Sequence, residues 1–466
     1  MSIKSLIKST GVYFIGNVLS KIIIFFLLPI YTSYIPPESM GMYDTGVTVI
    51  TLFVSALFLD IGSVILKFTL EKENDNISSP ITNGTIIFFF SCVLYLIVLI
   101  VSSMFFKFPY FEWIILYGFI YALNNMVGYV ARALHYNTDY AIAGVIQTLL
   151  MVILNIVMLI GLKMDYRSLY ISFSLSSFIA TIYMLWKAHI YKYLKKVSFD
   201  REKFVQMLKF ALPLCVNSMA FWLLSSSGRV IVTYVLGADA TGYLSVANKF
   251  NQIIYLVSTC VHMTWQETAF AHDNARENEG GFYSNTFSVY YRVVLYCIAL
   301  LIPAIRLGLF VFPEFIDSSY SSSINLIPTA LIGTGLAIIS QFLGTIFISI
   351  KKTTIVFLST LAGAITTVTT TFLFIYLGFG PESANYSFIL GYLVAITIRI
   401  LLLKKHIRFR FRIRNLLYLI PILLVTIYVY INYTHIYNII MLVILLLASP
   451  LFFAKELKGL RGKIKL

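Results

Sequence analysis

The sequence contains few charged residues, and acidic residues are the scarcest of them. Only 12% of the 466 residues are charged, with 20 Asp and Glu against 35 Lys and Arg, whereas 59% are hydrophobic. A soluble chain of this composition would leave a large apolar surface in water, so a soluble globular protein is excluded. A helix of about 20 apolar residues crosses a bilayer. The composition therefore predicts an all-α polytopic membrane protein.

Cysteine, histidine and nucleotide-binding motifs are also scarce. The four cysteines lie in apolar runs and are typical of small buried side chains, not of disulfides or metal ligands. The six histidines are scattered along the chain, and no glycine-rich P-loop is present. The sequence therefore predicts no catalytic residues, no metal and no cofactor, and the protein is not expected to be an enzyme.

Long apolar runs, by contrast, are abundant, and basic residues lie mostly in alternate loops between them. On the side of the N-terminus these loops hold 26 Lys and Arg, and the opposite loops hold three, Lys107, Lys163 and Arg167. This bias predicts that both termini are cytoplasmic, and it argues against nucleic acid as the target of the positive charge. The fourteen predicted spans are 10–32, 41–66, 81–103, 110–131, 139–162, 168–187, 210–234, 241–263, 287–310, 324–349, 354–377, 383–403, 416–433 and 435–453.

The first twelve spans form two groups of six, which are expected to be related by a parallel repeat around a central cleft. Gly41-Met42-Tyr43 in the first group has a counterpart in Gly242-Tyr243 in the second. The expected domains are an N-terminal six-helix lobe (1–190), a cytoplasmic basic linker (191–209), a second six-helix lobe (210–403), and a C-terminal part (404–466) with a basic loop, two further transmembrane helices and a basic tail.

Six cations lie within or at the edges of the predicted spans, where an unpaired charge is costly. Lys21, Arg229 and Lys249 are the most central, and Asp44 and Asp60 are acids near span interiors. Two interpretations remain open: a buried ion pair, or a site for phosphate or pyrophosphate. We predict that the three central cations bind a diphosphate. Three further cations are expected to reach the membrane surface from span ends: Arg292, Arg306 and Arg399.

Polar side chains recur at helical spacing on several spans. Such stripes either join helices through hydrogen bonds or line a water-filled cavity, and both interpretations remain open here. The predicted cavity lining is Asn17, Asp44, Thr48, Thr51, Asp60, Trp222, Ser225, Asn248, Gln252 and Tyr255. The candidate coupling carboxylates are Asp44, Asp60 and Glu267.

Several stretches, taken in order along the chain, resemble one transporter family. They are Gly16-Asn17-Val18-Leu19-Ser20-Lys21, Leu59-Asp60-Ile61-Gly62, Gly228-Arg229 with Leu236-Gly237-Ala238-Asp239, Thr264-Trp265-Gln266-Glu267, and Lys351-Lys352-Thr353. Together they resemble the Wzx-type flippases for O-antigen and capsule polysaccharide, which belong to the MATE-like (MOP) superfamily. One departure is Glu267, because the family motif usually has a proline shortly after Trp265-Gln266.

The resemblance implies alternating access and transport of an undecaprenyl-diphosphate-linked oligosaccharide across the bacterial cytoplasmic (inner) membrane. It implies a role for Lys21 and Arg229 at the carrier diphosphate. H+ or Na+ is the expected coupling ion, and polymerase or chain-length proteins are the expected partners. A lipid II flippase, a multidrug exporter of the superfamily and a polysaccharide polymerase are alternatives. A cation exporter favours an acidic cavity and a polymerase a large external loop, and the sequence predicts neither.

Overall fold

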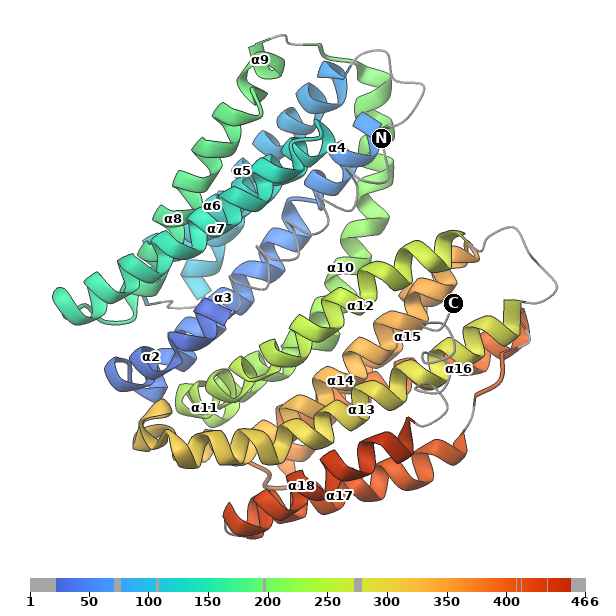
Figure 1. The fold of residues 1–466 in the computed structure, drawn as a ribbon. Coiled ribbons are helices and arrows are strands. Elements are labelled where there is room, and N and C mark those ends of the chain that lie inside the picture. The colour runs from blue at the N-terminus through green and yellow to red at the C-terminus, as the bar shows by residue number, and fades with distance from the viewer. Residues whose placement is uncertain are drawn as a thin grey trace. The chain divides into compact units, whose positions relative to one another are not determined.

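The computed structural model describes residues 22–70, 77–105, 109–195, 198–271, 279–407, 409–411, 413–433 and 435–453. Within these ranges the secondary structure is helical, without a strand, and ten helices have the length and composition to cross a membrane (Figure 1). The predicted all-α polytopic fold is confirmed for this part of the chain. Contacts between residues divide the chain into two compact units: residues 1–249 with 360–391, and residues 250–359 with 392–466.

The first unit contains most of the helices of the N-terminal half. They are α2 (Leu28–Tyr34), α3 (Pro37–Leu57), α4 (Ile61–Leu70), α5 (Ser78–Phe105), α6 (Phe111–Ala133), α7 (Asn137–Ile156, continued by η1, Val157–Gly161), α8 (Arg167–Lys187), α9 (Ile190–Lys195), α10 (Arg201–Leu236) and α11 (Ala238–Lys249), with parts of α15 (Thr353–Tyr376) and α16 (Glu382–His406). Helix α3 packs against α10 and α11, α8 packs against both α6 and α7, and α4 packs against α6.

Two spans that the sequence predicted as continuous, 41–66 and 241–263, are each broken into two helices. Helix α3 ends at Leu57, and Leu59 and Asp60 adopt left-handed conformations with φ of 55° and 48° before α4 begins. Asp is one of the few residues that tolerate this conformation, and the Ser63 hydroxyl donates to the Asp60 carboxylate at 2.7 Å. In the other span, Phe250 separates α11 from α12 (Asn251–Ala271). Hydropathy averages over such breaks and does not locate them.

Helix α10 begins well before the predicted span 210–234. Its N-terminus is capped by the Asp200 carboxylate, which accepts hydrogen bonds from the backbone N–H groups of Glu202 at 2.9 Å and Lys203 at 3.2 Å. The Asn83 side chain on α5 donates to the Asp200 carbonyl oxygen at 3.1 Å. The basic stretch 191–209 therefore contains helical turns and is anchored on α5.

Two glycines bring α3 and α11 into close contact. A Cβ atom added to Gly41 would lie 1.8 Å from the Ala238 carbonyl oxygen, and one added to Gly242 would lie 2.0 Å from the Pro37 carbonyl oxygen. Small residues let helix backbones approach in this way within membranes. These are the two glycines that the predicted repeat relates. Their contact sets the spacing of the polar residues that follow on both helices.

The second unit is built around α13. Its helices are α12, α13 (Glu279–Val311), η2 (Pro313–Phe315), η3 (Ser318–Tyr320), α14 (Ser321–Ser349), η4 (Ile413–Asn415), α17 (Leu416–Asn432) and α18 (His435–Phe452), with the remaining parts of α15 and α16. Helix α13 contacts α14, α17 and α18. The Arg292 guanidinium donates to the Phe452 carbonyl oxygen at 3.3 Å, and the Tyr296 hydroxyl donates to that of Leu445. The two C-terminal helices are thus attached to α13.

Candidate functional site

An ion pair joins α3 and α10 in the first unit. Arg229 Nη1 lies 3.0 Å from Asp44 Oδ2, and the two side chains are 27% and 18% exposed. The other terminal nitrogen of Arg229 lies 3.4 Å from Ser226 Oγ. The sequence left an ion pair and an anion site open for Arg229, and the structure shows the ion pair. Both side chains are only partly buried within the first unit.

Three threonines fix the backbone of Arg229. The Thr233 hydroxyl lies 2.6 Å from that of Thr45 and 2.7 Å from that of Thr241. The hydroxyl oxygens of Thr233 and Thr241 also lie 3.0 Å and 3.2 Å from the Arg229 carbonyl oxygen, which accepts a hydrogen bond from one of them while that hydroxyl accepts from the other. The three threonines come from α10, α3 and α11. The network therefore holds these helices in register and keeps Arg229 opposite Asp44.

Lys249, the last residue of α11, is close enough to Asp44 and Arg229 to interact electrostatically with both. It is half-buried. Within the described ranges, no carboxylate forms an ion pair with it. Asp44, Arg229 and Lys249, here called the central charged cluster, carry two positive charges and one negative charge. The cluster therefore has a net positive charge, which favours an anionic ligand.

Four other predicted lining residues lie on α3 and α10, and one contact among them joins the two helices. The Trp222 indole N–H donates to the Thr48 carbonyl oxygen at 3.0 Å, and both residues are buried. The Thr51 hydroxyl donates to the same carbonyl oxygen at 2.7 Å. The Ser225 hydroxyl lies 3.1 Å from that of Ser226. The first contact joins α3 to α10, and the other two lie within α3 and within α10. A cavity-lining role for the four predicted residues stays a prediction.

Asp60 lies at the break between α3 and α4. It is in electrostatic range of Tyr121 and Tyr129 on α6 and of Cys215 on α10. No Lys or Arg among the described side chains forms an ion pair with it. The structure therefore pairs Arg229 with Asp44 and places Asp60 beside tyrosines.

The remaining predicted site residues belong to other parts of the chain. Asn248 lies on α11 in the first unit, whereas Gln252 and Tyr255 lie on α12 in the second. Asn248 and Tyr255 both have interaction partners. Lys21 and Asn17 lie outside the described residues, as does the side chain of Glu267. Their predicted roles stay predictions.

Arg399 contradicts the expectation that it reaches the membrane surface. It is only 5% exposed. Its Nε donates to Ser359 Oγ at 2.9 Å, Nη1 to Ser340 Oγ at 2.8 Å, and Nη2 to the Val356 carbonyl oxygen at 3.3 Å. These neutral acceptors lie on α14 and α15, so the arginine on α16 joins the three helices. Position within an apolar run does not reveal such acceptors, which explains the error.

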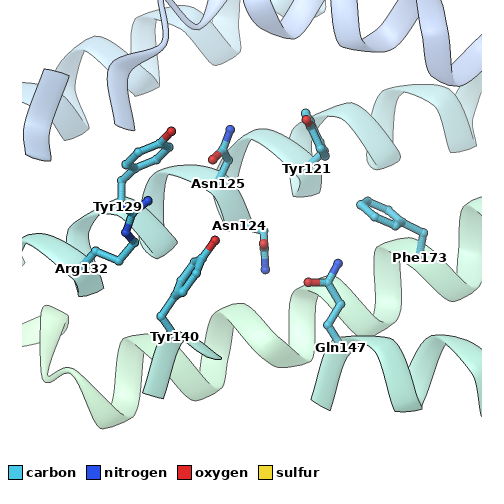
Figure 2. Close-up of a pocket in the computed structure, with 8 residues that line it drawn as sticks. All are labelled: Tyr121, Asn124, Asn125, Tyr129, Arg132, Tyr140, Gln147 and Phe173. Carbon is cyan, nitrogen blue, oxygen red and sulfur yellow. The ribbon is translucent and has the colours of Figure 1, made fainter. Parts of the chain in front are cut away.

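Sequence reasoning also missed a polar pocket in the first unit. Tyr121, Asn125 and Tyr129 recur at four-residue intervals along α6, and they line a pocket of about 220 Å³ together with Arg132 (Figure 2). This spacing places the four side chains along one side of the helix. The stripe is visible within the predicted span 110–131 and the loop after it, so the pattern was a usable signal.

The fold is that of the MOP superfamily transporters. A lipid II flippase, MurJ, in an inward closed conformation is similar with a TM-score of 0.68 and 15% identity, over 96% of this chain and 99% of that one. An inward-facing multidrug resistance MATE family transporter is similar with a TM-score of 0.67 and 15% identity, over 84% of this chain and 97% of that one. A MOP superfamily transporter from Pyrococcus furiosus, with a binding pocket described as reversed in polarity, is similar with a TM-score of 0.53 and 16% identity. The match covers 85% of this chain and 95% of that one.

The family model for polysaccharide biosynthesis proteins matches residues 6–265, and the chain belongs to that family. A comparison with curated proteins gave no match. The resemblance carried by the sequence motifs is therefore confirmed for family and fold. The chain is a multi-pass membrane protein with a transporter fold.

Proposed function

We propose that the protein is a flippase for undecaprenyl-diphosphate-linked oligosaccharide repeat units. It moves them across the bacterial cytoplasmic membrane by alternating access, for O-antigen, capsule or related polysaccharide synthesis. The family supports polysaccharide biosynthesis, and the fold supports transport. The observation that carries the substrate assignment is the net positive charge of Asp44, Arg229 and Lys249, because a diphosphate is the anionic part of such a substrate.

The ion pair gives a diphosphate a place to bind. Arg229 donates an N–H group of its guanidinium to the Asp44 carboxylate. The same planar N–H donors also bind phosphate oxygens. In the proposed cycle the diphosphate displaces the carboxylate from Arg229. Lys249 adds a second positive charge and gives up no ion-pair partner among the described residues. Lys21, outside the described residues, is proposed as a third cation for the same diphosphate.

Displacement of Asp44 also provides a coupling step. A carboxylate that has lost its arginine and lies beside a diphosphate needs a new cationic partner, and H+ is the smallest one. Binding of the substrate and binding of a proton are then linked. We therefore propose H+ as the coupling ion and Asp44 as the carboxylate that binds it. Asp60 and Glu267 are further candidates.

The proposed moving bodies are the lobes 1–190 and 210–403, joined by the linker 191–209. Residues 404–466 lie outside the proposed repeat, and both termini are placed in the cytoplasm by the charge bias. Single cysteines introduced at Lys163 and Glu382, in a background without native cysteines, should react with impermeant thiol reagents from outside the cell. A cysteine at Lys192 should not. Reversed labelling would contradict the orientation.

The test of function is complementation of a flippase-deficient host. The wild-type chain should restore surface polysaccharide. Arg229→Gln and Lys249→Gln should reduce it and cause lipid-linked repeat units to accumulate, with normal protein levels in the membrane. Arg167→Gln is the matched control, because this cation pairs with Asp165 and is well exposed. Full export by both cluster variants would remove the diphosphate assignment, and failure of the wild type to complement would remove the flippase assignment.

A further inference from the structure

The pocket between α6, α7 and α8 is a second polar site in the first unit (Figure 2). None of the three residues of the central charged cluster lines it. Its lining combines amides, aromatic rings and one arginine. Its volume is about 220 Å³. Pockets for drug-sized ligands begin at about 300 Å³, so this one suits a single small ring.

Two amides in the pocket are held by hydrogen bonds to α8, and the orientation of one of them is defined. The Asn124 amide nitrogen donates to the Ser177 carbonyl oxygen at 3.1 Å and to Thr181 Oγ1 at 3.0 Å. The Gln147 amide nitrogen donates to Ser177 Oγ at 2.7 Å. Since a carbonyl oxygen only accepts, the Asn124 nitrogen must face Ser177. The Asn124 carbonyl oxygen is therefore left as an acceptor for a ligand's hydroxyl group. The Ser177 hydroxyl can donate or accept, so the far end of the Gln147 amide offers a ligand either an oxygen or an N–H group.

Aromatic rings form one end of the pocket. Phe173 stacks on Tyr117, with ring centres 4.2 Å apart and an interplanar angle of 23°. Tyr121 lies beside it at 6.2 Å. Figure 2 shows Phe173 and Tyr121 at one end of the group and Tyr129, Tyr140 and Arg132 at the other, with the amides between them. An apolar ring face next to fixed hydrogen-bond acceptors matches a sugar, which has C–H faces and a rim of hydroxyl groups.

Arg132 supplies a positive charge at the other end. Its guanidinium lies 5.3 Å from the ring centre of Tyr129 and 5.8 Å from that of Tyr140. No carboxylate among the described side chains forms an ion pair with it. The ring contacts occupy none of its ion-pairing capacity, and a guanidinium has five N–H donors with which to bind a carboxylate. Asn125, on the same side of α6, adds a further amide to the lining.

We propose that this pocket binds one pyranose ring that carries a carboxylate, a uronic acid residue of the transported glycan. The ring stacks on Phe173, one of its hydroxyl groups donates to the Asn124 oxygen, another hydrogen-bonds to the Gln147 amide, and Arg132 binds the carboxylate. This inference rests on the proposed function, because a glycan substrate is what brings a sugar to the protein. It assigns a sugar subsite separate from the diphosphate site.

The test uses the purified full-length protein in lipid nanodiscs and saturation-transfer difference NMR. The probes are glucuronate and galacturonate, with glucose and galactose as their neutral counterparts. The wild-type protein should bind at least one uronate about tenfold more tightly than its neutral counterpart, as expected for one charge-assisted interaction. Arg132→Gln should remove that preference. Gln147→Leu should weaken binding of acidic and neutral sugars alike, and Arg167→Gln, the matched control, should change neither.

Thermal unfolding of each variant separates a binding effect from a folding effect. Equal binding of uronates and neutral sugars by the wild type would overturn the acidic-sugar assignment. Lowered stability of Gln147→Leu with unchanged sugar binding would show that the amides only join helices, and would overturn the site. The result is independent of export: if the wild type binds uronates but fails to complement a flippase-deficient host, the proposed function fails and the sugar site stands.

Discussion

Two arginines that the sequence placed in similar apolar surroundings are held in different ways. Arg229, in the first unit, pairs with the Asp44 carboxylate at 3.0 Å, and its side chain is 27% exposed. Arg399, in the second unit, is 5% exposed and donates to neutral acceptors, among them Ser359 Oγ at 2.9 Å and Ser340 Oγ at 2.8 Å. An anionic partner that is reachable can be exchanged for a substrate anion. Neutral acceptors buried between helices cannot.

The surroundings of Arg399 are shaped to its guanidinium. A Cβ atom added to Gly344 would lie 3.3 Å from Arg399 Nη1, so the glycine leaves room for the head group. The acceptors come from α14 and α15, while Arg399 itself is on α16. Its role is therefore to hold three helices of the second unit together. Arg229, by comparison, has an anionic partner and is the arginine proposed to bind the diphosphate.

The largest effect is expected from removing the buried arginine. Arg399→Ala leaves several buried acceptors unsatisfied and opens a cavity, so we expect a loss of about 3–5 kcal/mol in the free energy of unfolding. The measurement is the unfolding temperature of detergent-solubilised protein, together with its level in the membrane. Arg399→Lys should recover only part of the loss, because an ammonium group cannot reproduce the planar donors. An unchanged unfolding temperature for Arg399→Ala would remove the structural role.

The ion pair of Arg229 allows a sharper test of the comparison. Arg229→Gln and Asp44→Asn each leave one partly buried charge without its partner. Each should lower the free energy of unfolding by about 2 kcal/mol, a value between those for breaking an exposed ion pair and a buried one. The double variant should regain most of that stability. Export should not recover, because the diphosphate has lost its arginine. Full export by the double variant would mean that Arg229 serves only to neutralise Asp44.

The sequence predicted the all-α polytopic fold because apolar runs are a strong signal, and ten described helices that could cross a membrane overlap predicted spans. It failed where a local conformation or a distant partner decided the outcome. The break at Leu59 and Asp60 depends on two backbone φ angles. The burial of Arg399 depends on serines about 40 and 59 positions away in the chain. Neither is visible in hydropathy. Asp44 was recognised as a possible partner of the central cations, because few acids lie near the span interiors.

The pocket on α6 shows a different limit. Tyr121, Asn125 and Tyr129 follow a helical spacing that the sequence displays. Their partners Gln147 and Phe173 come from α7 and α8, and nothing in the chain's pattern shows that these helices face α6 at that point. A stripe on one helix is thus detectable from sequence, whereas a site made by three helices needs the fold.

Lys249 tests whether a cation that forms no ion pair among the described residues serves in binding, as proposed for Arg229, or in stability, as Arg399 does. Since Lys249 is half-buried and no described carboxylate forms an ion pair with it, Lys249→Gln removes a poorly solvated charge and should not lower the free energy of unfolding. Export of polysaccharide should nevertheless fall, because the cluster loses its net positive charge. The paired measurements are unfolding temperature and surface polysaccharide. A large loss of stability with normal export would place Lys249 with Arg399 as a structural residue.

The smallest effect is expected at the exposed pair of Arg167 and Asp165, 2.8 Å apart with side chains 43% and 37% exposed. Partial burial alone would raise the pKa of the Asp165 carboxyl, but hydrogen bonds from the Tyr110 hydroxyl and the Arg167 backbone N–H and guanidinium hold it below its ordinary value. A lowered pKa in the folded state stabilises the fold above the unfolded-state pKa of about 3.9, and that contribution is lost as the pH falls through the folded-state value. Asp165→Asn should therefore leave export and stability at pH 7 nearly unchanged, since exposed pairs contribute little, and should slightly flatten the decline of the unfolding temperature below about pH 4. A large loss of stability at pH 7 would show that the exposure of an arginine does not predict how much its contacts stabilise the fold. The comparison among Arg399, Arg229 and Arg167 would then fail.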